Sequence, residues 1–185
     1  MKPDLSAEHG LLARARLHDS DTLALIFDTY YAAIFRYIYV RVGHKETAED
    51  LAAHVFQRLL AHLHDGRGPE QFLKAWLFRV AENLIIDEAR RGALRTHAPL
   101  DDNAGWLSSS PDEDDPIVLN NLRTALEQLP SVQRQAVTLH YLLELSNDDI
   151  AQIMNLSVGA VKAHVHRGLT ALRNNMSEKT NHEPE

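Results

Sequence analysis

Residues 146–173 read SNDDIAQIMNLSVGAVKAHVHRGLTALR, and this stretch predicts two helices joined by a tight turn. Ser146 is a favoured N-cap, and Asp149 three residues later resembles the second half of a capping box. Asn155 tolerates the left-handed conformation that ends many helices. Ser157 is then a favoured N-cap for the next helix. A short helix, a tight turn and a longer helix together form a helix-turn-helix.

The second helix of this pair is basic and contains no carboxylate. Its charged residues are Lys162, Arg167 and Arg173. The second helix of a helix-turn-helix enters the major groove of DNA, and DNA presents a surface dominated by phosphate. We therefore expect this helix to bind DNA. Its predicted buried face consists of Val161, Val165, Leu169 and Leu172.

The composition limits the class of protein. The chain has 185 residues, 44% of them hydrophobic, no cysteine and a formal net charge of −7. This length suits one or two small domains, and the lack of cysteine excludes disulfides and thiolate metal sites. We expect a cytoplasmic protein without membrane insertion, because no apolar run approaches the length of a membrane span and the N-terminus lacks a signal pattern.

Most of the negative charge lies in one segment. Residues 92–117 carry 1 Lys or Arg against 6 Asp and Glu, whereas residues 118–176 carry 5 against 4. The segment is also rich in proline, glycine and serine, which predicts a flexible linker. The sequence therefore divides into a first domain (1–91), the linker, a second domain (118–176) and a tail (177–185).

Apolar residues recur every three or four positions without a strand pattern, which predicts an all-α fold. In the first domain we expect a short N-terminal helix and three long ones. Gly43 closes the first long helix, Thr47 caps the second, and the third runs from about residue 71 to residue 91 before Gly92. In the second domain we expect four helices, beginning at Pro116, a favoured first helical residue.

Three motifs in a fixed order resemble the extracytoplasmic-function (group 4) sigma factors of bacterial RNA polymerase. They are TAEDLAAHVFQRLLAHL, FLKAWLFRVAENLIIDEARR and ALEQLPSVQRQAVTLHYLLELSNDDIAQIMNLSVGAVKAHVHRGLTALR. The resemblance covers roughly residues 20–91 and 118–176. It implies a sigma-two-like domain that grips the β′ clamp helices of core RNA polymerase and opens the minus-10 element. It also implies a sigma-four-like domain that reads the minus-35 element of promoter DNA and docks on the β flap, and an anti-sigma factor that restrains the protein.

The resemblance assigns core polymerase binding to the helix that begins near Thr47. Ala53 and His54 depart from the family pattern, in which glutamine and an acidic residue are common. An ordinary solvated helix face is the alternative, because charged helix faces usually contact only water. The expected polymerase-binding residues are Glu49, Asp50, Leu51, Phe56 and Arg58.

The segment from residue 66 to residue 91 mixes aromatic and basic side chains, which suit stacking of unpaired bases and contact with their backbone. Asn83 offers hydrogen bonds to a flipped base. Trp76 can instead belong to the core, and Glu82 is expected to repel phosphate. The expected minus-10 residues are Arg67, Phe72, Lys74, Arg79, Asn83, Arg90 and Arg91.

In the second domain, Lys162 and His166 lie four residues apart and share an exposed face. Lysine and arginine reach phosphates and guanine edges, although long side chains also cover the apolar stem of a helix. The expected minus-35 residues are Ser157, Lys162, His164, His166 and Arg167.

Histidines and catalytic patterns offer little support for other functions. The chain has 11 histidines, but the pairs His62/His64 and His164/His166 have a spacing that points two helical side chains apart, so we expect no metal site. The sequence shows no phosphate loop and no nucleophile elbow, so we expect neither an enzyme nor a cofactor.

The resemblance therefore predicts a sigma factor that binds core RNA polymerase and directs promoter-specific transcription initiation. A helix-turn-helix regulator that acts without polymerase is the main alternative, and a helical scaffold or anti-sigma-like protein is the third. A plain regulator has no need of the two motifs in the first domain, and the carboxylate-free helix argues against a protein that binds no DNA.

Overall fold

The computed structural model describes the backbone of residues 5–95 and 116–180, and side chains within residues 8–92 and 121–174. The chain divides into two compact units, residues 1–101 and 102–185. The described residues form helices and connecting turns without a strand, which confirms the all-α prediction. Residues 96–115, which make up most of the predicted linker, lie outside the described residues.

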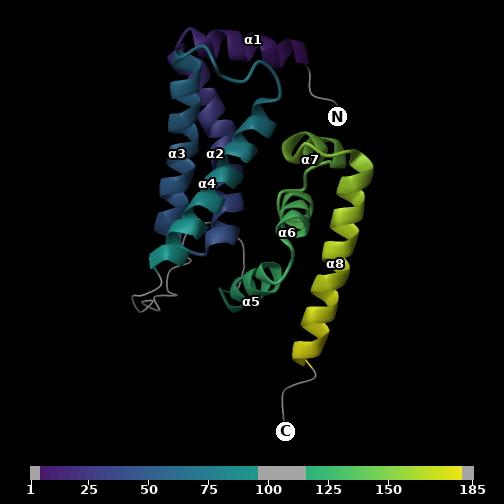
Figure 1. Cartoon of the computed structure of the whole chain (residues 1–185). Helices are drawn as coiled ribbons and strands as arrows, with labels where there is room; N and C mark the ends of the chain where they lie inside the picture. Colours follow the sequence, from purple (N-terminus) through teal and green to yellow (C-terminus); the bar gives the residue numbers. More distant parts are fainter. Residues whose placement is uncertain (1–4, 96–115, 181–185) are drawn as a thin grey trace. The chain divides into compact units, whose positions relative to one another are not determined.

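The first unit is a bundle of three long helices with a short one across its end. Helices α2, α3 and α4 pack against one another, and α1 lies across the end where α2 begins and α3 finishes (Figure 1). This matches the predicted arrangement of one short and three long helices. The bounds are Leu5–Arg16 for α1, Ser20–Val42 for α2, Lys45–His64 for α3 and Leu73–Arg95 for α4.

Local sequence signals set both ends of α2. The Asp19 carboxylate accepts hydrogen bonds from the backbone N–H of Thr22, at 3.2 Å, and from the Thr22 hydroxyl. Together with the ion pair to Arg14, these hydrogen bonds lower the pKa of Asp19. At the other end Gly43 closes the helix, as predicted. It adopts φ 79°, and its N–H donates to the Tyr39 carbonyl oxygen at 2.8 Å.

Contrary to the sequence expectation, α2 is long and apolar enough to cross a membrane by length and composition alone. Its packing explains the apolar residues differently. One side of α2 faces α3 and α4, and the Tyr37 ring meets Phe78 of α4 edge-on at 5.3 Å. Helix α2 therefore packs one face into the core of the unit. Its buried residues are Thr22, Ile26, Ile34, Tyr37 and Ile38.

Two predicted boundaries in the first unit are wrong, the start of α3 and the end of α4. Helix α3 begins at Lys45 after His44, without a side-chain cap, rather than at Thr47. Helix α4 begins at Leu73 and continues to Arg95, through Gly92. A single interior glycine costs a helix only about 1 kcal/mol relative to alanine, which is too little to end α4 by itself. Helix α4 therefore extends beyond residue 91.

The second unit contains the predicted helices, with one irregularity. The segment that begins at Ser131 changes from α-helical to π-helical geometry at Thr138. Pro116 starts its helix as expected, and the last helix continues four residues into the predicted tail. The bounds are Pro116–Glu127 for α5, Ser131–Val137 for α6, Thr138–Leu142 for η1, Asn147–Met154 for α7 and Val158–Thr180 for α8.

The turn between α7 and α8 has the predicted capping interactions. The Ser146 hydroxyl oxygen accepts the N–H of Asp149 at 3.1 Å, and the Ser157 hydroxyl oxygen accepts the N–H of Ala160 at 3.2 Å. Between them Asn155 adopts the left-handed conformation, with φ 54°. These interactions confirm the helix-turn-helix geometry.

The buried face of α8 differs from the prediction at one position. Val161, Val165 and Leu172 are buried, but Leu169 is only partly so, and Gly168 is buried in its place. A Cβ atom added to Gly168 would lie 2.6 Å from Val137 Cγ2. The missing side chain therefore lets the backbone of α8 approach α6 closely.

We predict that Gly168→Ala destabilises the second unit by about 1–3 kcal/mol, the usual cost of overpacking a core. The stiff Val137 side chain cannot turn away from the new methyl group without strain. Urea unfolding followed by circular dichroism measures the effect. Gly159→Ala is the control, since a Cβ there meets only the Ser157 hydroxyl at 4.0 Å. Equal stability of the two variants would contradict the close approach.

Candidate functional site

A buried ion pair joins α2 to α4. Arg41 donates to both oxygens of Glu82, from Nη1 at 2.9 Å and from Nη2 at 3.1 Å, and the Tyr37 hydroxyl donates to the same carboxylate. The two charged side chains are only 4% and 12% exposed. Burial opposes the charge on Arg41, but the Glu82 carboxylate and the Tyr37 hydroxyl oxygen, which both accept hydrogen bonds from it, outweigh burial and raise the pKa of the guanidinium.

The ion pair corrects the expectation that Glu82 repels phosphate. Its carboxylate points into the bundle and is neutralised by Arg41, so α4 turns its other side outward. The exposed residues there recur at steps of four, three and four, which places them on one face. We call this row the α4 stripe: Arg79, Asn83, Ile86 and Arg90. Ile86 is 37% exposed and was not predicted.

The loop between α3 and α4, residues 65–72, has an unusual backbone. Gly66 adopts φ 67°, and Gly68 is buried so closely against Leu63 that a Cβ would lie 2.7 Å from Leu63 Cδ2. Phe72 also has a positive φ, 57°, and its side chain is 36% exposed. A bulky residue in this conformation costs about 1–3 kcal/mol and persists only where its surroundings enforce it.

The other predicted minus-10 residues lie near this loop or farther along α4. Arg67 is exposed and forms an ion pair with Asp65, whose pKa is lowered by the hydrogen bond from Arg67 and by its charge. Lys74 is partly buried and Arg91 is exposed. Trp76 is half-buried, and its ring meets His62 of α3 edge-on at 5.4 Å. Trp76 therefore lies at the edge of the core.

The predicted polymerase-binding residues of α3 separate into two groups. Leu51 and Phe56 are 4% and 8% exposed and belong to the core, where Phe56 packs against Phe27 of α2 at 4.9 Å. Their packing against the core holds α3 in place, with its opposite side toward solvent. The exposed side of α3, which we call the α3 face, consists of Glu49, Asp50, Ala53, His54, Gln57, Arg58 and Leu60.

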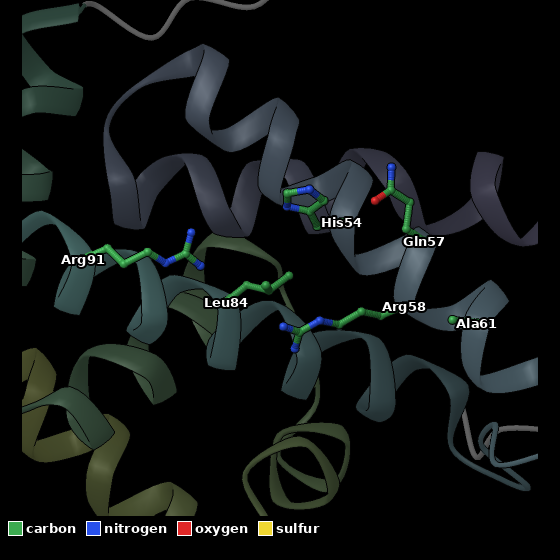
Figure 2. Close-up of a pocket in the computed structure, with 6 residues that line it drawn as sticks. All are labelled: His54, Gln57, Arg58, Ala61, Leu84 and Arg91. Atoms are coloured by element: carbon green, nitrogen blue, oxygen red, sulfur yellow. The ribbon is translucent and has the colours of Figure 1, made fainter. Parts of the chain in front are cut away.

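An open hollow of about 400 Å³ lies between α3 and α4. Arg58 and Arg91 extend toward Leu84 from opposite sides of it (Figure 2). These two arginines were assigned by sequence to different partners, the first to polymerase and the second to DNA. Because both line one hollow, the α3 face adjoins the exposed end of α4. The lining residues are His54, Gln57, Arg58, Ala61, Leu84 and Arg91.

In the second unit, the predicted residues gather along α8. Lys162, His166 and Arg167 are exposed. His164 is partly buried, and its Nδ1 lies 3.4 Å from Nη2 of Arg167. Ser157 caps the helix with its hydroxyl oxygen, which leaves the hydroxyl proton available to a ligand. The structure thus presents a cationic face at the start of the second helix of the helix-turn-helix.

The described histidines do not form a metal centre. Among the described side chains, within residues 8–92 and 121–174, no group of three or more His, Asp or Glu is arranged to hold a metal ion. His62 contacts Trp76, and His64 meets His18 edge-on at 5.5 Å.

Comparison with protein families identifies both units. The family model described as Sigma-70 region 2 matches residues 26–95, and the one described as Sigma-70, region 4 matches residues 119–172. The chain is 30% identical over 172 residues to the ECF RNA polymerase sigma factor SigW of Bacillus subtilis, covering 86% of this chain and 91% of SigW. It is 31% identical over 166 residues to the ECF RNA polymerase sigma factor BldN of Streptomyces coelicolor, covering 88% of this chain but only 63% of BldN.

Two solved structures share the fold at low sequence identity. CnrH, in complex with the cytosolic domain of CnrY, has a TM-score of 0.69 at 19% identity, covering 93% of this chain and 98% of that chain. The sigma factor RpoE of Bartonella quintana, in complex with the anti-sigma factor NepR, has a TM-score of 0.62 at 22% identity, covering 83% and 96%.

We predict that Arg41→Met lowers the free energy of unfolding of the first unit by about 3–5 kcal/mol, because it leaves the Glu82 carboxylate buried and unpaired. Adding Glu82→Met should recover most of the loss, since an apolar pair of similar volume replaces the ions. Chemical denaturation followed by circular dichroism measures both changes. Arg36→Met, at an exposed position of the same helix, is the control and should change stability by less than about 0.5 kcal/mol. A double variant as unstable as the single one would contradict this account.

Proposed function

Because the chain belongs to the extracytoplasmic-function sigma factors, we propose that it binds core RNA polymerase and brings it to promoters with minus-10 and minus-35 elements. The observation that carries the proposal is the match of both units, in order, to the two sigma-70 regions. A helix-turn-helix regulator that works without polymerase would not need the first of these matches.

We assign promoter opening to the α4 stripe and the loop that precedes α4. Opening a duplex requires surfaces on which unpaired bases stack, together with cations for their backbone. Phe72 offers an exposed ring, and Arg79 and Arg90 offer cations on the same helix as Asn83. The amide of Asn83 can both donate and accept hydrogen bonds, which suits the edge of a flipped base.

We assign core polymerase binding to the α3 face. It combines the carboxylates of Glu49 and Asp50 with the cation of Arg58. Leu60 is 44% exposed on the same face and gives it an apolar element. Mixed charge around an exposed apolar side chain is typical of protein interfaces, which have a desolvated centre and a polar rim. The hollow beside Arg58 adds a concave surface to this face.

We assign minus-35 recognition to the start of α8, where Ser157, Lys162, His166 and Arg167 are exposed. The second unit is a weak electrostatic anchor by itself, because residues 118–176 carry only 5 Lys and Arg against 4 Asp and Glu. Non-specific DNA affinity follows the number of phosphates that are neutralised. The unit should therefore hold DNA well only when polymerase supplies further contacts, including one between the β flap and this unit.

The same assignment carries three further expectations. The protein has no enzymatic activity of its own, since polymerase performs the chemistry. It acts in the cytoplasm, where the chromosome lies. We also expect an anti-sigma factor to restrain it, since the similar sigma factor RpoE forms a complex with the anti-sigma factor NepR.

A mobility-shift experiment tests the proposal. Promoters are first identified from the transcripts that the reconstituted holoenzyme makes from host DNA. Duplexes of these promoters are then mixed with this protein, with core polymerase, or with both. We expect a specific complex only with both proteins. A specific shift by this protein alone, unchanged by polymerase, would favour the independent regulator. Failure to bind core polymerase would overturn the proposal.

We predict that Lys162→Ala weakens holoenzyme binding to the minus-35 element and lowers the slope of log affinity against log salt by about 0.9, the value for one lost phosphate contact. Lys45→Ala removes an exposed lysine of the first unit and is the matched control. Fluorescence anisotropy measures the DNA affinity of both variants over a salt range of roughly 50 to 200 mM. An unchanged slope for Lys162→Ala would show that this residue does not contact phosphate.

A further inference from the structure

Helix α1 contacts the loop of residues 65–72 and the helix after it at two points. The Glu8 carboxylate accepts a hydrogen bond from the backbone N–H of Leu73 at 2.6 Å, across 65 residues of sequence. Arg16 donates from Nη2 to the carbonyl oxygen of Pro69 at 3.3 Å. Both α1 residues point to the same side, because Glu8 and Arg16 are two helical turns apart.

The core fixes the position of α1. Leu12, midway between Glu8 and Arg16, is 1% exposed, and Ala15 is fully buried. Figure 1 shows α1 lying across the end of the bundle, where the chain passes from α3 to α4. The two polar contacts are therefore made from a helix that is itself held firmly in place.

Glu8, which lies on α1, acts as an N-cap for α4. The first N–H groups of a helix have no partner within it, and an N-cap side chain normally accepts one of them. Phe72 precedes α4 but has no side-chain oxygen, and its φ of 57° is unusual for a bulky residue. The Glu8 carboxylate supplies the missing acceptor, and the helix dipole favours its negative charge there.

Phe72 lies between the two anchored points. Pro69 is held on one side and Leu73 on the other, while the Phe72 side chain remains exposed. The backbone at Phe72 therefore has little freedom to relax to an ordinary φ, which would redirect the ring. The contacts of α1 thus determine where an exposed aromatic ring stands at the start of α4.

We propose that α1 is a positioning element for promoter opening, with Glu8 and Arg16 holding the loop so that Phe72 is presented to the unpaired strand. Glu8 acts through Phe72 and does not itself contact DNA. The inference rests on the proposed function, since it concerns how the opening surface of that function is set.

The experiment uses reconstituted holoenzyme and promoter duplex, and measures unpaired thymines with permanganate. We expect Glu8→Ala to reduce promoter opening about five- to tenfold, the scale of a lost N-cap. Glu8→Gln keeps an acceptor oxygen and should open the promoter within about twofold of the wild type. His9→Ala, at the neighbouring exposed position of α1, is the control and should leave opening unchanged.

A second comparison separates positioning from general stability. In a Phe72→Ala background, Glu8→Ala should reduce opening no further, because the ring that it positions is already gone. Core polymerase affinity and the thermal midpoint of Glu8→Ala are measured alongside. Equal losses in both backgrounds, or a loss of opening that only follows a loss of core affinity, would overturn the proposal. Normal opening by Glu8→Ala would also overturn it, whereas a wild-type holoenzyme that opens no promoter would instead refute the proposed function.

Discussion

The ion pair between Arg41 and Glu82 is the constraint on which the arrangement of the first unit depends. Both charges are nearly excluded from water, so each requires the other, and the Tyr37 hydroxyl adds a third interaction. Such pairs contribute little net stability compared with apolar packing, but a misaligned pair would leave a buried charge uncompensated. The interaction therefore selects one rotation of α4 against α2, and that rotation leaves the α4 stripe exposed.

The second unit reaches its geometry through different forces. The N-caps at Ser146 and Ser157 set the turn of the helix-turn-helix. Gly168, which has no side chain, lets α8 lie close to α6. Its near-balanced charge leaves little attraction for DNA beyond the exposed cations of α8. Under the proposed assignments, an opening surface lies in one unit and a weakly charged recognition helix in the other, so we expect the two units to need polymerase to act together.

The sequence predicted best what neighbouring residues determine. The caps at Ser146 and Ser157 and the left-handed Asn155 depend on contacts within three or four residues, and all three are present in the structure. The all-α fold followed from apolar periodicity. The three motifs that resemble group 4 sigma factors also predicted the family correctly.

The sequence did not predict features that depend on partners far away along the chain. Glu82 appeared as a free charge because its partner Arg41 lies 41 residues away. The resemblance assigned Leu51 and Phe56 to polymerase binding, but both side chains are covered by the core. Helix α4 continues through Gly92 because one glycine costs a helix only about 1 kcal/mol. The Glu8 cap, 65 residues from Leu73, has no signal in the local sequence.

Crosslinking from two positions tests the central claim most directly. A photoreactive group is placed at Asn83 on the α4 stripe or at Lys162 on α8, and the holoenzyme is bound to promoter DNA before and after opening. The account predicts that the Lys162 probe reaches the minus-35 duplex in both states, while the Asn83 probe reaches the minus-10 non-template strand only after opening. An Asn83 probe that crosslinks only to polymerase, or to duplex DNA in both states, would contradict it.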